Sequence, residues 1–166
     1  MIQLNDKTIS AASEKGMDEF LQVFIDAYLE VIDGKLTAEN MNKLNGHQHT
    51  LLAWHFFTSE MREGGFVQLI QNGYGGYIFG NPFAKALRQF GATELSKLIY
   101  KAKEIYDPNK ALLERETTEV EFNAMFVEFE VFDELEEKYF EMEEQQTALI
   151  AAYVDDHIAD FGEIIQ

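Results

Sequence analysis

Residues 132–153 read FDELEEKYFEMEEQQTALIAAY. One set of positions in this stretch recurs at alternating steps of three and four, and nearly all of its members are apolar or aromatic: Phe132, Leu135, Tyr139, Met142, Gln146, Leu149 and Tyr153. That spacing places them on one side of an α-helix. Most of the other positions up to residue 144 are acidic. The pattern therefore predicts a long amphipathic helix with an apolar seam and a negatively charged outer face.

Helical spacing also recurs outside this stretch. Helices are expected over residues 20–31, 37–44, 47–61, 66–72, 82–90 and 93–106, the last one ended by Asp107-Pro108, and another helix is expected to begin at the capping box Thr118-x-x-Glu121. Residues 127–132 alternate between apolar and acidic, which leaves a helix and a short strand open. No run shows the β-branched alternation typical of a sheet protein. The sequence predicts an all-α fold: a compact single-domain helical bundle over residues 1–166, with about seven to nine helices and a long acidic C-terminal helix.

The chain has the size of one domain, with 166 residues of which 46% are hydrophobic. It has no cysteine, which excludes disulfides, thiolate metal sites and cysteine nucleophiles. The four histidines form neither an HExxH nor a Glu-x-x-His pattern, and no GxSxG or calcium-loop motif occurs. We therefore expect no metal, no cofactor and no enzymatic activity. The N-terminus lacks the features of a signal peptide, so a cytoplasmic protein is expected.

The net charge of −17 is concentrated at one end of the sequence. Residues 1–113 carry 13 acids and 11 bases, whereas residues 114–166 carry 17 acids and two bases, Arg115 and Lys138. Phosphates are bound by cationic side chains, so this composition argues against binding to nucleic acid or to anionic membranes. The expected partners are basic protein surfaces.

The acids are densest between residues 130 and 144. Eight acids occur there against Lys138 alone: Glu130, Asp133, Glu134, Glu136, Glu137, Glu141, Glu143 and Glu144. On a helix these residues span about 22 Å, or about one net charge per 3 Å, which is close to the ~3.4 Å per charge of a single DNA strand. Five of them form an acidic stripe at steps of four and three: Glu130, Glu134, Glu137, Glu141 and Glu144. Three interpretations stay open: a solvated face, internal pairing with Lys97, Lys101 or Lys103, and a partner-binding face.

A glycine-rich segment lies near the middle of the chain. It contains Gly64-Gly65-Phe66-x-Gln68, then Asn72, a connection over residues 73–80, and a helix that ends in Phe-Gly-Ala at residues 90–92. The glycines permit a tight turn, and Gln68 and Asn72 are expected to hydrogen-bond loop backbone. Together with the acidic tail over residues 132–157, this motif resembles the DMP19-like family of acidic DNA-mimic proteins. The resemblance covers about residues 45–160, with Glu63 where an Asn is expected.

The resemblance implies an all-α protein whose acidic side chains occupy the phosphate-binding surface of a bacterial DNA-binding protein, such as a transcriptional regulator. The alternative is an immunity or antitoxin-like protein that neutralises a basic toxin. Either function would use the same candidate face, and a homodimer is compatible with both. The candidate residues are the eight acids named above together with Asp155 and Asp156, and Gly64, Gly65, Phe66, Gln68 and Asn72 form a structural motif.

Overall fold

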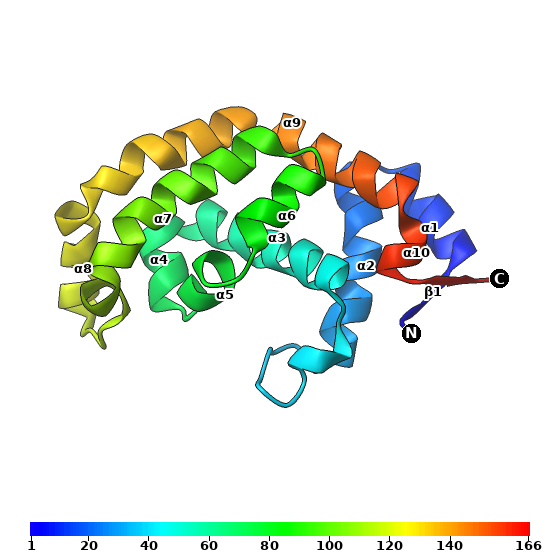
Figure 1. The fold of residues 1–166 in the computed structure, drawn as a ribbon, viewed down its shortest axis with the longest axis horizontal. Helices are drawn as coiled ribbons and strands as arrows, with labels where there is room; N and C mark the ends of the chain where they lie inside the picture. Colours follow the sequence, from blue (N-terminus) through cyan, green and yellow to red (C-terminus); the bar gives the residue numbers. More distant parts are fainter. The chain divides into compact units, whose positions relative to one another are not determined.

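The computed structural model of the protein describes residues 1–166, and nearly all of its regular structure is helical (Figure 1). The elements, with η denoting a 3-10 helix, are β1 (Gln3–Asn5), α1 (Asp6–Ser13), α2 (Met17–Val31), η1 (Met41–Lys43), α3 (Gly46–Glu63), α4 (Gly65–Gln71), α5 (Gly75–Phe79), α6 (Phe83–Gln89), α7 (Thr93–Glu114), α8 (Glu119–Glu128), η2 (Glu130–Phe132), α9 (Asp133–Asp156), α10 (Ile158–Phe161) and β2 (Glu163–Ile165). The predicted all-α fold and its long C-terminal helix, α9, are confirmed. The ten α-helices exceed the expected seven to nine.

Contacts between residues group the chain into two compact units. Unit 1 comprises residues 1–52 and 147–166, and unit 2 comprises residues 53–146. Two helices, α3 and α9, contain residues of both units. The single-domain organisation stays a prediction. None of the helices combines the length and the apolar character that a membrane span requires.

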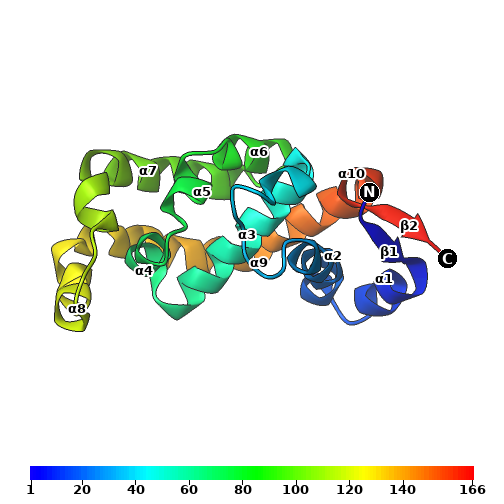
Figure 2. The same ribbon diagram turned by 90° about the horizontal axis from the view of Figure 1, so that it is seen from below.

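Unit 1 brings the two ends of the chain together, a feature that helical periodicity does not predict. Strands β1 and β2 lie side by side (Figure 2) and pair in parallel. In their register Leu4 is opposite Ile164. The backbone of Gly162, just before β2, approaches β1 so closely that a Cβ atom would lie 2.5 Å from Cδ1 of Leu4. The carbonyl of Phe161 accepts hydrogen bonds from the hydroxyl of Tyr28 (2.8 Å) and the side-chain amide of Gln48 (3.1 Å). These contacts fix the C-terminal segment against α2 and the start of α3.

Unit 2 is built around an aromatic core. The rings of Phe57 and Tyr139 meet edge to face with their centroids 5.1 Å apart, and those of Phe66 and Phe132 stack at 5.1 Å. These residues come from α3, α9, α4 and η2, so the core joins elements that are distant in the sequence. Trp54, on α3, is buried as well.

Helix α7 continues through Pro108, although the sequence predicts that it ends there. Proline lacks an N–H and crowds the carbonyl four residues earlier, at a cost of about 3 kcal/mol. The side-chain amide of Asn109 donates to the carbonyl of Ile105 (2.9 Å), which supplies a hydrogen bond beside the interruption. Tyr106 and Leu113 are buried on either side of the proline. Their burial stabilises a helix that continues past the proline.

Three local predictions were wrong, and one alternative that the sequence left open is decided by the structure. Residues 37–44 form turns and the 3-10 helix η1 instead of a helix, and the expected connection over residues 73–80 contains α5. Pro82 is the N-cap of α6 and not its first residue. Residues 127–132 form the end of α8 and η2, so the strand alternative is excluded. Each error concerns a short segment, where tertiary contacts outweigh local preference.

Candidate protein-binding acidic face

Helix α9 turns one side inward along its length. The buried positions are Phe132 just before the helix, then Leu135, Tyr139, Gln146, Thr147, Ile150, Ala151 and Val154. The expected seam was correct at its start but wrong at its end, where Leu149 is exposed and Ile150 is buried instead. A straight helix has 3.6 residues per turn, so a strict 3.5-residue repeat drifts off its buried side.

Gln146 is a polar member of the buried side, and it has a defined structural role. Its side-chain oxygen accepts a hydrogen bond from the backbone N–H of Leu95 in the first turn of α7 (3.1 Å). The N-cap of α7 is Ala92, whose side chain has no acceptor. Gln146 therefore satisfies an N–H group that the helix itself leaves unpaired.

Most of the predicted acids are exposed. In unit 2 these are Glu130, Asp133, Glu134, Glu137, Glu141 and Glu144, and in unit 1 they are Asp155 and Asp156. The last two lie in the final turn of α9, which contains no base, although acids at a helix C-terminus oppose the helix dipole. Glu136 and Glu143 are partly buried. The sequence thus predicts the outer face well but does not separate these two inward acids from the rest.

Glu136 is held by the glycine-rich motif. Its carboxylate accepts a hydrogen bond from the backbone N–H of Phe66 in the first turn of α4 (2.9 Å). Burial raises the pKa of Glu136, the Phe66 N–H opposes that rise, and the nearby Asp133 adds to it. A Cβ atom on Gly65 would lie 2.1 Å from the same carboxylate, and Gly65 has a φ of +83°. Gly65 therefore provides both the turn and the space for this contact.

The other members of the motif bind acids of α3, and the prediction that they bind loop backbone was wrong. The side-chain amide of Gln68 donates to Glu60 and to Glu63, both at 3.3 Å, and that of Asn72 donates to Glu60 at 2.9 Å. A Cβ atom on Gly64 would collide with the Gln68 side chain. The motif Gly-Gly-Phe-x-Gln thus packs α4 closely against the end of α3.

Glu143 pairs with Arg62 of α3. Nε and Nη2 of Arg62 donate to the same carboxylate oxygen at 2.9 and 2.6 Å. Thr58 donates to that oxygen at 3.4 Å and also shares a short hydrogen bond with the Tyr139 hydroxyl. Burial raises the pKa of Tyr139 to about 12. Glu143 therefore belongs to an internal polar network.

The basic residues give little neutralisation to the acidic stripe. Lys97 pairs with Glu94 (3.6 Å) and Lys103 with Asp107 (2.6 Å), each within α7. Lys138 pairs with Glu134 (3.0 Å), and its hydrogen bond and charge lower the pKa of that carboxyl, with a smaller contribution from Lys101. Lys97 and Lys103 therefore pair within α7 and not with the stripe, and of the three lysines Lys101 is the one whose charge acts on a stripe acid, Glu134.

The charge density of the face is lower than the sequence predicts. Residues 133–144 span about 18 Å at ~1.5 Å per residue. Their five exposed acids and Lys138 leave four uncompensated negative charges. That is one charge per ~4.5 Å, compared with ~3.4 Å along a single DNA strand. The difference arises because Glu136 and Glu143 are turned inward.

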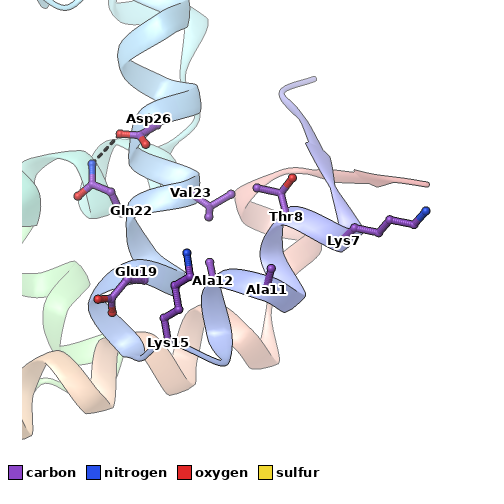
Figure 3. Close-up of a pocket in the computed structure, with 9 residues that line it drawn as sticks. All are labelled: Lys7, Thr8, Ala11, Ala12, Lys15, Glu19, Gln22, Val23 and Asp26. Carbon is purple, nitrogen blue, oxygen red and sulfur yellow. Dashed lines mark hydrogen bonds between the residues drawn. The ribbon is translucent and has the colours of Figure 1, made fainter.

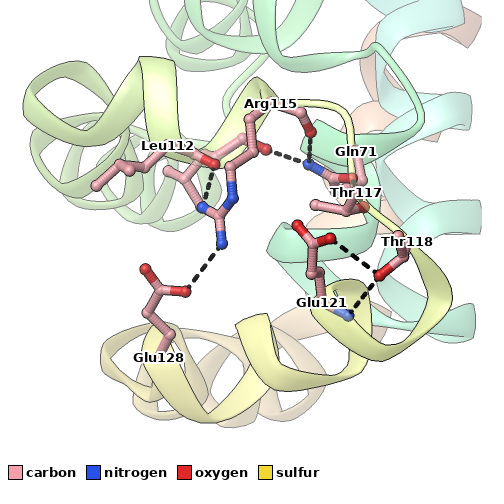
Figure 4. Close-up of polar contacts among 8 residues, drawn as sticks. Gln71, Leu112, Arg115, Thr117, Thr118, Glu121 and Glu128 are labelled. Carbon is pink, nitrogen blue, oxygen red and sulfur yellow. Dashed lines mark hydrogen bonds and ion pairs between the residues drawn. The ribbon is translucent and has the colours of Figure 1, made fainter.

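Helix α8 carries three exposed acids that are not among the predicted face residues: Glu119, Glu121 and Glu128. Arg115 pairs with Glu128 (3.2 Å), and the N-cap Thr118 accepts a hydrogen bond from the backbone N–H of Glu121 (3.2 Å; Figure 4). The Thr118 hydroxyl also contacts the Glu121 carboxylate, which replaces the second bond of a full capping box. Residues 116–137 contain nine acids and no base, a signal by which the sequence could have extended the face to α8.

A groove of about 510 Å³ lies between α1 and α2 in unit 1 (Figure 3). Its lining includes the small side chains of Ala11, Ala12 and Val23. Lys7 belongs to α1 and Lys15 to the turn that follows it, whereas Glu19 and Asp26 belong to α2. The lining is thus balanced in charge and does not extend the acidic face.

Comparison with known proteins finds a family and a relative with similar sequences. A family described as DMP19-like protein matches residues 42–157, which include the glycine-rich motif and the acidic stripe. The chain is 34% identical over 147 residues to a protein of Neisseria meningitidis serogroup B (strain ATCC BAA-335 / MC58) named DNA mimic protein DMP19. That alignment covers 88% of each of the two chains.

Proposed function

Because the chain belongs to the DMP19-like family, we propose that it is an acidic DNA mimic that occupies the DNA-binding surface of a bacterial DNA-binding protein, such as a transcriptional regulator. The observation that carries the proposal is the acidic stripe on unit 2, where Lys138 is the one base that pairs with a stripe acid. Carboxylates at this spacing offer the lysines and arginines of a DNA-binding surface an alternative to phosphates.

Fixed contacts on the inner side of α9 support this function. Glu136 is anchored at Phe66, Glu143 at Arg62, and Gln146 at Leu95. The outward carboxylates therefore project from a helix whose rotation is fixed before a partner arrives, which reduces the entropy lost on binding. Like charges one turn apart repel by a few tenths of a kcal/mol per pair, so the stripe opposes stability. Selection for partner binding would account for that cost.

The first prediction tests the stripe directly. Replacing Glu134, Glu137, Glu141 and Glu144 with Gln removes four exposed charges and preserves helix propensity. Partner affinity is expected to fall about tenfold, since four screened contacts at ~0.3–0.5 kcal/mol each total about 1.4 kcal/mol. Its salt dependence should also weaken, while thermal stability stays level or rises slightly. The test uses the bacterial proteins that DNA-cellulose retains. These proteins are applied to the immobilised protein, and those that bind are then released with duplex DNA.

A matched control separates position from net charge. Replacing Glu14, Glu30, Glu104 and Glu163, which are exposed and outside the stripe, with Gln gives the same net charge. This control is expected to retain its partner. Equal losses in both variants would mean that only total charge matters and would refute the stripe as the binding face. Binding that duplex DNA fails to displace would favour the antitoxin-like alternative.

A further inference from the structure

Helix α8 is apolar on two sides. Its inner side, together with the residue that caps it, contributes the buried side chains of Met125 and Phe129 to unit 2. Val120 and Val127 lie seven residues apart and therefore share another side, where they are 79% and 74% exposed. Val131 follows four residues later in η2 and is 55% exposed. We call Val120, Val127 and Val131 the valine patch.

Exposed acids flank the valine patch along the chain. Each valine has at least one exposed acid beside it in the sequence: Glu119, Glu121, Glu128 and Glu130. The nearest base in the sequence, Arg115, is engaged by Glu128 and by the carbonyl of Leu112 (Figure 4). A molecule that covers the valines must therefore tolerate or neutralise several carboxylates.

This charge pattern selects among possible occupants. A second copy of the chain would bring the same acids to the contact, and like charges that face each other across an interface disfavour association. Nucleic acid and anionic lipid carry phosphates and are repelled in the same way. A protein surface with apolar side chains among lysines and arginines is complementary to both the valines and their acidic surroundings.

We propose that the valine patch is an apolar anchor for a basic protein partner. This inference rests on the proposed function. Helix α8 leads through η2 directly into α9, so the patch is continuous along the chain with the acidic stripe. Salt screens the carboxylate contacts, whereas burial of apolar surface persists at high salt. The patch thus adds a hydrophobic contribution to binding that a phosphate backbone lacks. The protein can therefore keep its partner bound at salt concentrations that weaken the charge contacts.

Two synthetic helical peptides with identical Lys and Arg content test this anchor. One carries leucines on its central face, and the other carries glutamines at the same positions. The wild-type protein is expected to bind the leucine peptide roughly tenfold more tightly, as expected for partial burial of several aliphatic side chains. A triple variant with Val120, Val127 and Val131 replaced by Ser should bind both peptides equally, with an unchanged salt dependence.

The controls distinguish this inference from the proposed function. A variant with Ser at Tyr100 and Leu149, which are exposed apolar residues outside the patch, should retain the preference for leucine. The stripe variant should keep that preference and lose affinity for both peptides. Equal binding of both peptides by the wild type overturns the anchor and leaves the stripe intact, whereas an unaffected stripe variant overturns the proposed function. Sedimentation that shows a dimer in the wild type but not in the triple variant would make a second copy the occupant and also overturn the inference.

Discussion

At the scale of single residues, two glycines of the glycine-rich segment differ in what an added Cβ atom would contact. Gly65 and Gly73 both have positive φ angles, +83° and +88°. An added Cβ would meet nothing within 4 Å at Gly73, but at Gly65 it would meet the carboxylate of Glu136. The two positions thus share a backbone conformation and differ in their surroundings. Comparing alanine substitutions at the two sites therefore separates the cost of backbone strain from the cost of losing a tertiary contact.

The residue-scale prediction compares Gly65→Ala with Gly73→Ala. Gly73→Ala is expected to cost about 1 kcal/mol of unfolding free energy, because a left-handed conformation is unfavourable for alanine. Gly65→Ala is expected to cost about 2–3 kcal/mol, because Glu136 must also leave the N–H of Phe66. Urea denaturation followed by circular dichroism measures both values. Equal losses would mean that the contact between Glu136 and Phe66 contributes nothing to stability.

At the scale of elements, the start of α7 depends on a side chain from α9. Ala92 offers no cap, and the N–H of Leu95 is satisfied by Gln146, which is 2% exposed. The local sequence around residue 93 predicts a helix start, but the N-cap residue Ala92 supplies no side-chain acceptor for this N–H. The acceptor comes from a residue 51 positions later in the chain.

The element-scale prediction concerns this cap. Gln146→Ala leaves the buried N–H of Leu95 without a partner and is expected to cost about 1–3 kcal/mol. Gln145→Ala, at the exposed neighbouring position, should change stability by less than about 0.5 kcal/mol. Chemical denaturation gives both values. Similar small losses would show that water or another group replaces Gln146 at α7.

At the scale of the whole molecule, the open point is whether the two units unfold together. Helices α3 and α9 each contain residues of unit 1 and unit 2, and a helix transmits order along its hydrogen-bonded backbone. We therefore predict a single cooperative transition. The fluorescence of Trp54, buried in unit 2, should be blue-shifted in the native state and should change at the same temperature as the circular dichroism signal.

Gly162→Ala tests this coupling from unit 1. The added methyl group would collide with Leu4 and disturb the pairing of β1 with β2. Each kcal/mol lost is expected to lower the Trp54 melting temperature by roughly 2–4 °C, although Trp54 belongs to unit 2. A circular dichroism transition that shifts while the Trp54 transition stays in place would show two independently folding units.

The sequence by itself determined the helical class, the length of α9 and the concentration of acid at one end of the chain. These features follow from local periodicity and composition, which need no knowledge of distant residues. The capping threonine Thr118 was predicted for the same reason. The exposure of Glu134, Glu137, Glu141 and Glu144 also followed from helical spacing.

Only the tertiary structure decided which acids face inward and where the elements end. Glu136 and Glu143 have the same local sequence character as their exposed neighbours, and they differ because Phe66 and Arg62 lie beside them. Pro108 stays within α7, where Tyr106 and Leu113 are buried, and β1 pairs with β2 although the two strands lie at opposite ends of the chain. The physical reason is the same in each case: a hydrogen bond or a buried surface supplied by a distant residue outweighs a local preference of about 1–3 kcal/mol.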